Sequence, residues 1–156
     1  MAEKAPDVSF LRADGSQVKL SSLIGQKTLV LFFYPKDHTA GCTAEACSFR
    51  DSYEDFKRAG ADVIGISADD AASHESFKKK NRLPFTLLTD KGGAAEAAFS
   101  IKKTFLGLVK GRVTFVIDRN GEIRHRFESQ VQLKKHVSEA LEIVRKLENE
   151  ATPSAA

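Results

Sequence analysis

Short apolar runs alternate with amphipathic stretches along this chain, and the alternation predicts strands and helices in turn. Thr28–Tyr34 is a continuous apolar run, which is typical of a central strand covered on both faces. Asp62–Ser67 and Phe85–Thr89 are two further candidates for buried strands. Between the first two runs, the stretch from Cys42 to Ala59 repeats apolar residues at steps of three and four, which predicts a helix.

Two turn signals predict one early and one late hairpin, at Asp14-Gly15 and at Asn120-Gly121. The strands they would join are Val8–Leu11 with Val18–Leu20, and Arg112–Asp118 with Glu122–Phe127. Further helices are expected at Asp69–Asn81, Gly92–Phe99 and Gln132–Glu148. Because helical crossovers join parallel strands and the late hairpin adds antiparallel ones, this order predicts an α/β fold. Its sheet would be mixed, with helices on both faces.

Length and composition favour one globular domain. The chain has 156 residues, of which 42% are hydrophobic and 29% charged, which argues against disorder and fibrous repeats. We expect a single domain over residues 1–150 and a flexible tail over residues 151–156. The net charge of +3 is small and dispersed, which argues against nucleic acid as a partner. No apolar run approaches the roughly 20 residues of a membrane-spanning helix, and the N-terminus lacks a secretory signal.

The two cysteines, Cys42 and Cys47, are the most informative residues because they lie only five positions apart. Two thiols are too few for a disulfide scaffold or a four-thiolate zinc site. Cys42 follows a glycine and begins the predicted helix directly after the central strand. The N–H groups of a helix's first turn stabilise an anion, so we expect an ionised, accessible and nucleophilic thiol there. Thr39, three residues earlier, places a hydroxyl group that could orient a small polar substrate against the sulfur.

The spacing of the cysteines also limits how they can pair. With a rise of ~1.5 Å per residue and a radius of ~2.3 Å, their Cα atoms would lie roughly 8–9 Å apart in a continuous helix. A disulfide needs Cα atoms no more than about 7 Å apart, and these two side chains point to different faces. If a disulfide forms, the first turns of the helix must therefore unwind, so the bond would be a step in a reaction cycle and not a static crosslink.

The segment Pro35-Lys-Asp-His-Thr39-Ala-Gly-Cys42 resembles the Pro-x-x-x-Thr-x-x-Cys loop of peroxiredoxins. The second cysteine, five residues on, is similar to that of the peroxiredoxin Q (bacterioferritin comigratory protein) subfamily. Other matching segments are Phe49–Tyr53, Val63–Ser67, Leu83–Asp90, Gly111-Arg112 and Phe115–Asp118. One departure is Ala40, where the family usually has proline. The resemblance implies a thioredoxin-like three-layer fold, in which helices flank a mixed central sheet and an N-terminal β-hairpin comes first.

The resemblance also implies a reaction. The Cys42 thiolate would attack hydrogen peroxide or an organic hydroperoxide, giving a sulfenic acid and releasing water or an alcohol. Thr39 would hydrogen-bond the peroxide, Arg112 would favour the thiolate and stabilise the developing charge on oxygen, and Pro35 would shape and shield the loop. Cys47 would then condense with the sulfenic acid, and thioredoxin or a similar dithiol would reduce the resulting disulfide. No metal or organic cofactor is expected.

The resemblance further implies the setting in which the protein works. We expect a soluble monomer that binds neither nucleic acid nor membrane. The thiol cycle needs a supply of reducing equivalents, which suits a chloroplast or a bacterial cytoplasm. Similarity to plant and algal members favours the chloroplast, with the transit segment absent from the printed sequence.

Two other functions remain open. A thiol–disulfide exchange protein without peroxidase activity could have the same fold, but such proteins use Cys-x-x-Cys, whereas four residues intervene here. A non-enzymatic binding module, for instance for nucleic acid, is supported only by the small basic excess. His38 with both cysteines supplies three possible zinc ligands, at an unusual spacing and with no clear fourth.

Several of the singled-out residues also have purely structural explanations. Thr39 could be an ordinary helix cap and Arg112 a surface charge. Cys42 could be a small buried hydrophobic residue, and Cys47 could be a core residue. The apolar segment Phe105–Val109 could belong to the core, to a wall for alkyl peroxides or to a docking surface. Three histidines in charged contexts are expected to be solvated: His74, His125 and His136.

Overall fold

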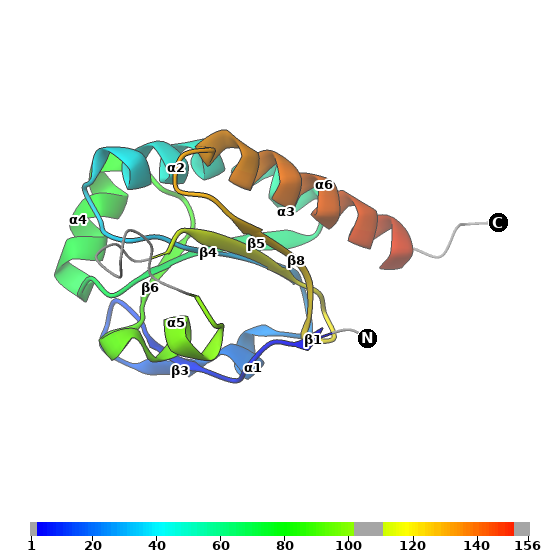
Figure 1. The fold of residues 1–156 in the computed structure, drawn as a ribbon, viewed down its shortest axis with the longest axis horizontal. Coiled ribbons are helices and arrows are strands. Elements are labelled where there is room, and N and C mark those ends of the chain that lie inside the picture. Colours follow the sequence, from blue (N-terminus) through cyan, green and yellow to red (C-terminus); the bar gives the residue numbers. More distant parts are fainter. Residues whose placement is uncertain (1–2, 102–110, 152–156) are drawn as a thin grey trace.

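One mixed β-sheet forms the centre of the fold in the computed structural model, which describes residues 3–101 and 111–151. Within these ranges, eight strands lie in the order β1-β8-β7-β4-β5-β6-β2-β3 (Figure 1). The strands are β1 Glu3–Lys4, β2 Ser9–Leu11, β3 Gln17–Lys19, β4 Thr28–Phe33, β5 Ala61–Ser67, β6 Thr86–Thr89, β7 Val113–Ile117 and β8 Glu122–Glu128. The helices are α1 Leu20–Leu23, α2 Ala40–Asp51, α3 Tyr53–Arg58, α4 Ala71–Asn81, the 3₁₀ turn η1 Lys91–Gly93, α5 Ala94–Ala98 and α6 Leu133–Ala151.

The strand pairing agrees with the mixed sheet expected from the sequence. β4, β5 and β6 pair in parallel, as expected for strands joined by helical crossovers. β7 and β8 form the late hairpin, and β7 pairs with β4 in antiparallel orientation. The early hairpin, β2 with β3, joins the sheet through β6. The predicted α/β class, mixed sheet and N-terminal hairpin are confirmed, whereas the short strand β1, paired with β8, is an element that the pattern does not predict.

Two apolar cores lie on opposite faces of the sheet. α2, α3, α4 and α6 cover one face, and α1 and α5 cover the other (Figure 1). Side chains of a strand point alternately to the two faces, so Val30 and Phe32 of β4 enter the first core and Leu31 enters the second. Every residue of β4 is buried, which explains why this stretch is a continuous apolar run in the sequence.

The helix expected over residues 42–59 is two helices in the structure. α2 begins at Ala40, two residues before the predicted start, and α3 follows after a break. At the break, Ser52 has φ −104° and ψ 3°, and its N–H donates to the carbonyl of Phe49, three residues back. Phe49 and Phe56 are both fully buried in the first core, so the break leaves the predicted apolar face in place.

Two of the three histidines expected to be solvated are buried, so the prediction is wrong for them. His74 is 5% exposed and His136 is fully buried, while His125 is half-buried beside Glu139. The two buried rings are satisfied by hydrogen-bond partners from distant parts of the chain, which the local sequence does not reveal. These partners are Asp37 and Leu88 for His74, and Thr114 and Ser129 for His136.

Some predictions fall on residues outside the described ranges. These are the apolar segment Phe105–Val109 and residues 152–156 of the predicted tail, whereas Ala151, expected to be the first residue of that tail, is the last residue of α6. The last helix, predicted to end at Glu148, continues to Ala151. Across residues 3–101 and 111–151, none of the helices combines the length and the apolar character needed to span a lipid bilayer.

Candidate active site

The segment between β4 and α2 places a thiol at the carboxyl edge of the parallel strands. A loop over residues 34–39 links β4 to α2, which begins at Ala40. The N–H of Thr43 donates to the carbonyl of Thr39, 2.9 Å away, and begins the hydrogen bonding of the helix. Cys42 therefore lies in the first turn, where backbone N–H groups have no partner within the helix and favour a negative charge.

Cys42 is 1% exposed, so the expectation of an accessible thiol is wrong for this conformation. Its side chain belongs to the first core, together with Val30, Phe32 and Tyr34. The first turn of α2 packs directly onto the sheet, and a periodic pattern within one helix does not reveal that contact. A substrate therefore reaches the sulfur only when the side chains that cover it move.

Arg112 reaches the same site from the residue just before β7. Its side chain is buried, with 5% exposure, so the alternative of a surface charge is wrong. Nη1 of Arg112 donates to Oε1 of Glu45 at 2.8 Å, and a Cβ atom on Gly41 would lie 3.1 Å from Nη2. Burial alone would lower the pKa of Arg112, but its interactions with Glu45 and Cys42 raise that pKa above its ordinary value. The guanidinium is thus a lasting positive charge beside Cys42 and the first turn of α2.

Glu45 is a member of the site that the sequence pattern does not single out. It is fully buried, and burial raises the pKa of its carboxyl to about 7, against the opposing effect of the Arg112 guanidinium. Among the described residues, its Oε2 has no hydrogen-bond partner. Glu45 follows Cys42 by three positions, which places both side chains on one side of α2. That spacing is the signal that could identify it from the sequence.

His136 lies behind the Arg112–Glu45 pair. Its Nδ1 is 3.5 Å from Oε2 of Glu45 and accepts a hydrogen bond from Oγ1 of Thr114 at 2.7 Å. Its Nε2 donates to the carbonyl of Ser129 at 2.8 Å. Burial lowers the pKa of His136 to about 4, so the ring is neutral near pH 7. Its single proton is on Nε2, which faces a carbonyl oxygen, and Nδ1 therefore accepts from Thr114. The positive charge next to Glu45 therefore comes from Arg112 and not from His136.

Thr39 and Pro35 lie on the loop side of the thiol. Thr39 is exposed at the start of α2, and its Oγ1 donates to the carbonyl of Lys36 at 3.0 Å. Its side chain makes no capping hydrogen bond to α2 within the part of the chain that the structure describes, so the interpretation as an ordinary cap is wrong. Pro35 is half-buried earlier in the loop. The turn that carries Cys42 thus has a hydroxyl group at its start and a guanidinium against it.

Cys47 lies further along α2 and is half-buried. α2 runs unbroken through both cysteines, and both thiols are free. The Sγ atom of Cys47 is 3.9 Å from Oδ1 of Asn81, the last residue of α4. This conformation is the reduced one, and the requirement that α2 unwind before the two cysteines bridge stays a prediction.

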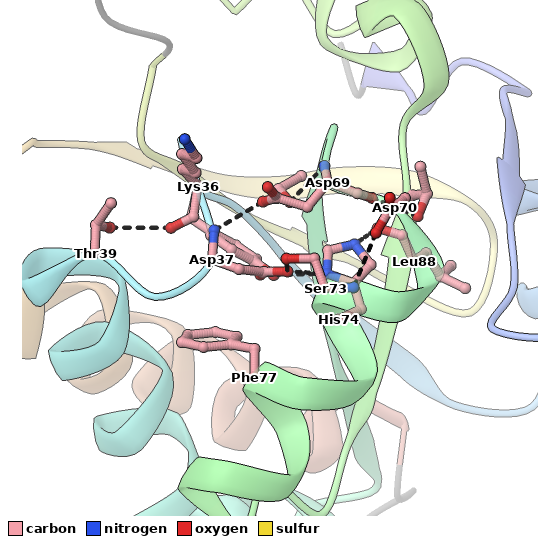
Figure 2. A network of polar contacts seen from close by, with 12 residues as sticks. Lys36, Asp37, Thr39, Asp69, Asp70, Ser73, His74, Phe77 and Leu88 are labelled. Carbon is pink, nitrogen blue, oxygen red and sulfur yellow. Dashed lines mark hydrogen bonds and ion pairs between the residues drawn. The ribbon is translucent and has the colours of Figure 1, made fainter.

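A second polar cluster ties the loop to α4 (Figure 2). It is centred on Asp37 and His74, whose pairing the sequence does not reveal because 37 positions separate them. The neighbouring His38 packs its ring against Phe77 of α4, with ring centroids 5.3 Å apart. His38 belongs to no group of potential metal ligands among the described residues, so the zinc interpretation with the two cysteines finds no support.

A thiol in the first turn of a helix, beside a buried guanidinium and followed by a second thiol, defines a thiol-based redox protein with an α/β fold. Comparison with known proteins gives the family. Residues 1–126 match the model of the AhpC/TSA family, and the chain belongs to this family. It is 48% identical over 143 residues to "Peroxiredoxin Q, chloroplastic" from Oryza sativa subsp. japonica, a match that covers 92% of this chain. The chain spans 65% of the length of that curated relative.

Solved structures of bacterial proteins are also similar. Peroxidoxin BcpB from Mycobacterium tuberculosis is 33% identical with a TM-score of 0.85, covering 94% of this chain and 96% of that chain. The bacterioferritin comigratory protein of Xanthomonas campestris is 29% identical with a TM-score of 0.83, covering 95% of this chain and 99% of that chain. The predicted thioredoxin-like fold and the resemblance to the peroxiredoxin Q subfamily are confirmed.

Proposed function

We propose that this protein is a thiol peroxidase that reduces hydrogen peroxide and organic hydroperoxides to water and alcohols. The observation that carries the proposal is the position of Cys42, in the first turn of α2 with the Arg112 guanidinium held beside it by Glu45. A helix N-terminus and a nearby cation both favour the thiolate, which is the nucleophilic form of cysteine. Membership of the AhpC/TSA family and similarity to peroxiredoxin Q support the same reaction.

In the proposed first step, the Cys42 thiolate attacks one oxygen of the peroxide. An S–O bond forms while the O–O bond breaks, so the sulfur is oxidised to a sulfenic acid and the departing oxygen takes up a proton. Arg112 would stabilise the negative charge that develops on this oxygen. Thr39, whose hydroxyl donates to the Lys36 carbonyl in the resting loop, would turn to hydrogen-bond the peroxide. Pro35 would shape the loop and shield the sulfenic acid from water.

In the proposed second step, Cys47 attacks the sulfur of the Cys42 sulfenic acid. An S–S bond forms, and the oxygen leaves as water after it takes up a proton. Because an intact α2 holds the two sulfurs apart, its first turns unwind before they meet. Cys47 loses only a weak contact with Asn81, 3.9 Å long, when it moves. Thioredoxin or a similar dithiol would then reduce the disulfide by thiol exchange.

The proposal also includes the cellular location and the oligomeric state of the protein. The rice relative is named as chloroplastic, which supports a chloroplast location for this chain. The bacterial relatives support a bacterial cytoplasm as the second choice. We propose that the protein acts as a monomer, with residues 1–150 as one domain and without a metal or organic cofactor.

The test is to mix the reduced wild type, Cys42→Ser and Cys47→Ser with an equimolar hydroperoxide and to follow thiol loss and intact mass. We expect a rapid internal disulfide in the wild type, no fast reaction in Cys42→Ser, and sulfenic or overoxidised Cys42 in Cys47→Ser. Fast peroxide consumption by Cys42→Ser would reverse the assignment of the two cysteines. A wild type that reacts no faster than free cysteine but readily reduces insulin disulfides would be a thiol–disulfide exchange protein instead.

A further inference from the structure

The loop that precedes Cys42 is held by Asp37, a residue with no role in the chemistry described above. Asp37 is 3% exposed and lies two residues before Thr39. Its backbone N–H donates to Oδ2 of Asp69 at 2.7 Å, and its Oδ1 accepts from the Tyr34 hydroxyl at 2.5 Å. Figure 2 shows side chains converging on the loop from the segment before α4 and from α4 itself.

His74 of α4 completes the anchor, which consists of Asp37 and its hydrogen-bond partners Tyr34, Asp69, Ser73 and His74. Its Nδ1 lies 2.7 Å from Oδ2 of Asp37, an oxygen that also accepts from the Ser73 hydroxyl at 2.9 Å. Its Nε2 lies 3.2 Å from the carbonyl of Leu88 in β6. A carbonyl oxygen only accepts, so Nε2 donates, and the close contact of Nδ1 with an ionised carboxylate requires a second proton on the ring. His74 and Asp37 then form a buried ion pair that joins the loop to α4 and β6.

The carboxyl group of Asp37 is kept ionised by these partners. Burial would raise the pKa of Asp37, but hydrogen bonds from His74, Tyr34 and Ser73 outweigh it and hold the pKa below its ordinary value. The three donors come from the end of β4 and from α4, so they fix the position of the carboxylate from more than one side.

His38, the next residue, adopts a backbone conformation that the anchor must impose. Its φ is 66°, in the left-handed region that residues other than glycine rarely adopt. Such a conformation persists where the surrounding contacts determine it. Here those contacts are the bonds of Asp37 and the packing of the His38 ring on Phe77. Together they set the direction in which the chain enters Thr39 and α2.

A metal site is the alternative explanation of this cluster. Ligand atoms of Asp37, Asp69 and His74 lie within 4.8 Å of one another, which is close enough to hold an ion. However, both oxygens of Asp37 already accept hydrogen bonds, and Nδ1 of His74 carries a proton in the ion pair and offers no lone pair. Oδ2 of Asp69 accepts from the Asp37 N–H and from Ser67. The cluster is better explained as a support for the loop.

We infer that Asp37, clamped by its three side-chain donors, is a positioning residue that holds Thr39 and the first turn of α2 in the geometry of the peroxide step. This inference rests on the proposed peroxidase function. The anchor precedes the turns of α2 that must unwind, so it can persist while the disulfide forms. Loss of the anchor should therefore slow the reaction of Cys42 with peroxide more than the later reduction of the disulfide.

Three variants separate positioning from stability. Asp37→Ala removes the three hydrogen bonds of the Asp37 side chain and leaves the bond from its backbone N–H to Asp69. Asp37→Asn keeps an acceptor for Tyr34 and offers an N–H to Nδ1 of His74, so the anchor survives without the charge. Asp118→Ala is the matched control, because Asp118 is also buried and multiply hydrogen-bonded. Asp118 directly follows β7, whose last residue pairs with the start of β4. The loop follows the end of β4, so Asp118 lies at the opposite end of the sheet from the loop.

The experiment measures two rate constants for each reduced, folded protein, well below its melting temperature: oxidation of Cys42 by hydrogen peroxide, and reduction of the disulfide form by dithiothreitol. We expect Asp37→Ala to slow the oxidation ~10- to 100-fold and Asp37→Asn to restore most of that loss. Asp118→Ala should lower the melting temperature and leave the oxidation rate unchanged. The reduction rate should change little in all three variants.

Several results would overturn the positioning role. One is a folded Asp37→Ala that is oxidised at the wild-type rate, and another is an Asp37→Asn that is as slow as Asp37→Ala. Should Asp37→Ala not fold, Tyr34→Phe removes one of the three bonds to Asp37 and must slow the same step. A wild-type rate in a folded Tyr34→Phe would then overturn the inference. A wild-type protein that does not react with peroxide would refute the proposed function itself.

Discussion

The buried pair of Glu45 and Arg112 leads to a quantitative prediction about stability. Burial raises the pKa of Glu45 from its ordinary value of 4.5 to about 7. An acid whose pKa rises on folding binds its proton more tightly in the folded state. Its contribution therefore favours folding at low pH and is lost as the pH rises from 4.5 through about 7. Glu45→Gln has nearly the shape of the protonated side chain but cannot ionise.

The size of the effect follows from the two pKa values. The rise from 4.5 to about 7, at about 1.4 kcal/mol per pH unit, corresponds to about 3 kcal/mol of unfolding free energy. Relative to the wild type, Glu45→Gln should therefore become more stable by about 3 kcal/mol between acidic pH and about pH 8. The prediction concerns only how the difference in unfolding free energy between the two proteins changes with pH, so the titrations that both proteins share cancel.

The assay is urea unfolding of both proteins under reducing conditions at several pH values across this range. Glu142→Gln, at an exposed site of α6, is the matched control. Its unfolding free energy should differ from that of the wild type by an amount that stays constant with pH. A constant difference for Glu45→Gln as well would refute the reasoning, because the Glu45 carboxyl would then not titrate as a buried acid. A difference that grows in the opposite direction would refute it too.

Three further predictions concern packing and the reaction cycle. Gly41→Ala places a Cβ 3.1 Å from Nη2 of Arg112, so the guanidinium must shift. Peroxide oxidation of Cys42 should therefore slow about tenfold, and an unchanged rate would show that this contact does not matter. Gly65→Ala places a Cβ 2.7 Å from Leu87 and 2.8 Å from Phe32. This overpacking should cost about 1–3 kcal/mol in urea unfolding, and a neutral effect would contradict it. Conversion to the internal disulfide should lower the helical signal in circular dichroism, because the first turns of α2 open, and an unchanged signal in fully bridged protein would contradict this geometry.

The regular elements could be predicted because their signals are local. β4 is buried on both faces, so its own sequence is a continuous apolar run, and the Asn120-Gly121 turn marks the hairpin of β7 and β8. The break at Ser52 could not be predicted, since apolar spacing continues across it. The burial of His136 could not be predicted either, because its partners at Thr114 and Ser129 meet it only in the folded chain.

Some features of the candidate site could also be predicted from the sequence, and others could not. The place of Cys42 in the first turn of a helix follows from the strand, the glycine and the apolar spacing around it. Its burial does not, because that depends on how the turn packs against the sheet. Only the family resemblance predicts that Arg112 lies near the sulfur of Cys42, because an arginine just before a strand is usually a surface charge. The local sequence does not reveal the role of Glu45, because its partner Arg112 lies 67 positions away.

One measurement tests the central claim, that Cys42 reacts with peroxide because the Arg112 guanidinium stands beside its sulfur. In Cys47→Ser, where the sulfenic acid persists, the rate constant of Cys42 oxidation by hydrogen peroxide is compared with and without the further change Arg112→Gln. Since the guanidinium would stabilise the charge on the departing oxygen, we expect Arg112→Gln to slow the reaction about 100-fold or more while circular dichroism shows a retained fold. An unchanged rate in the folded Arg112→Gln protein would contradict the account.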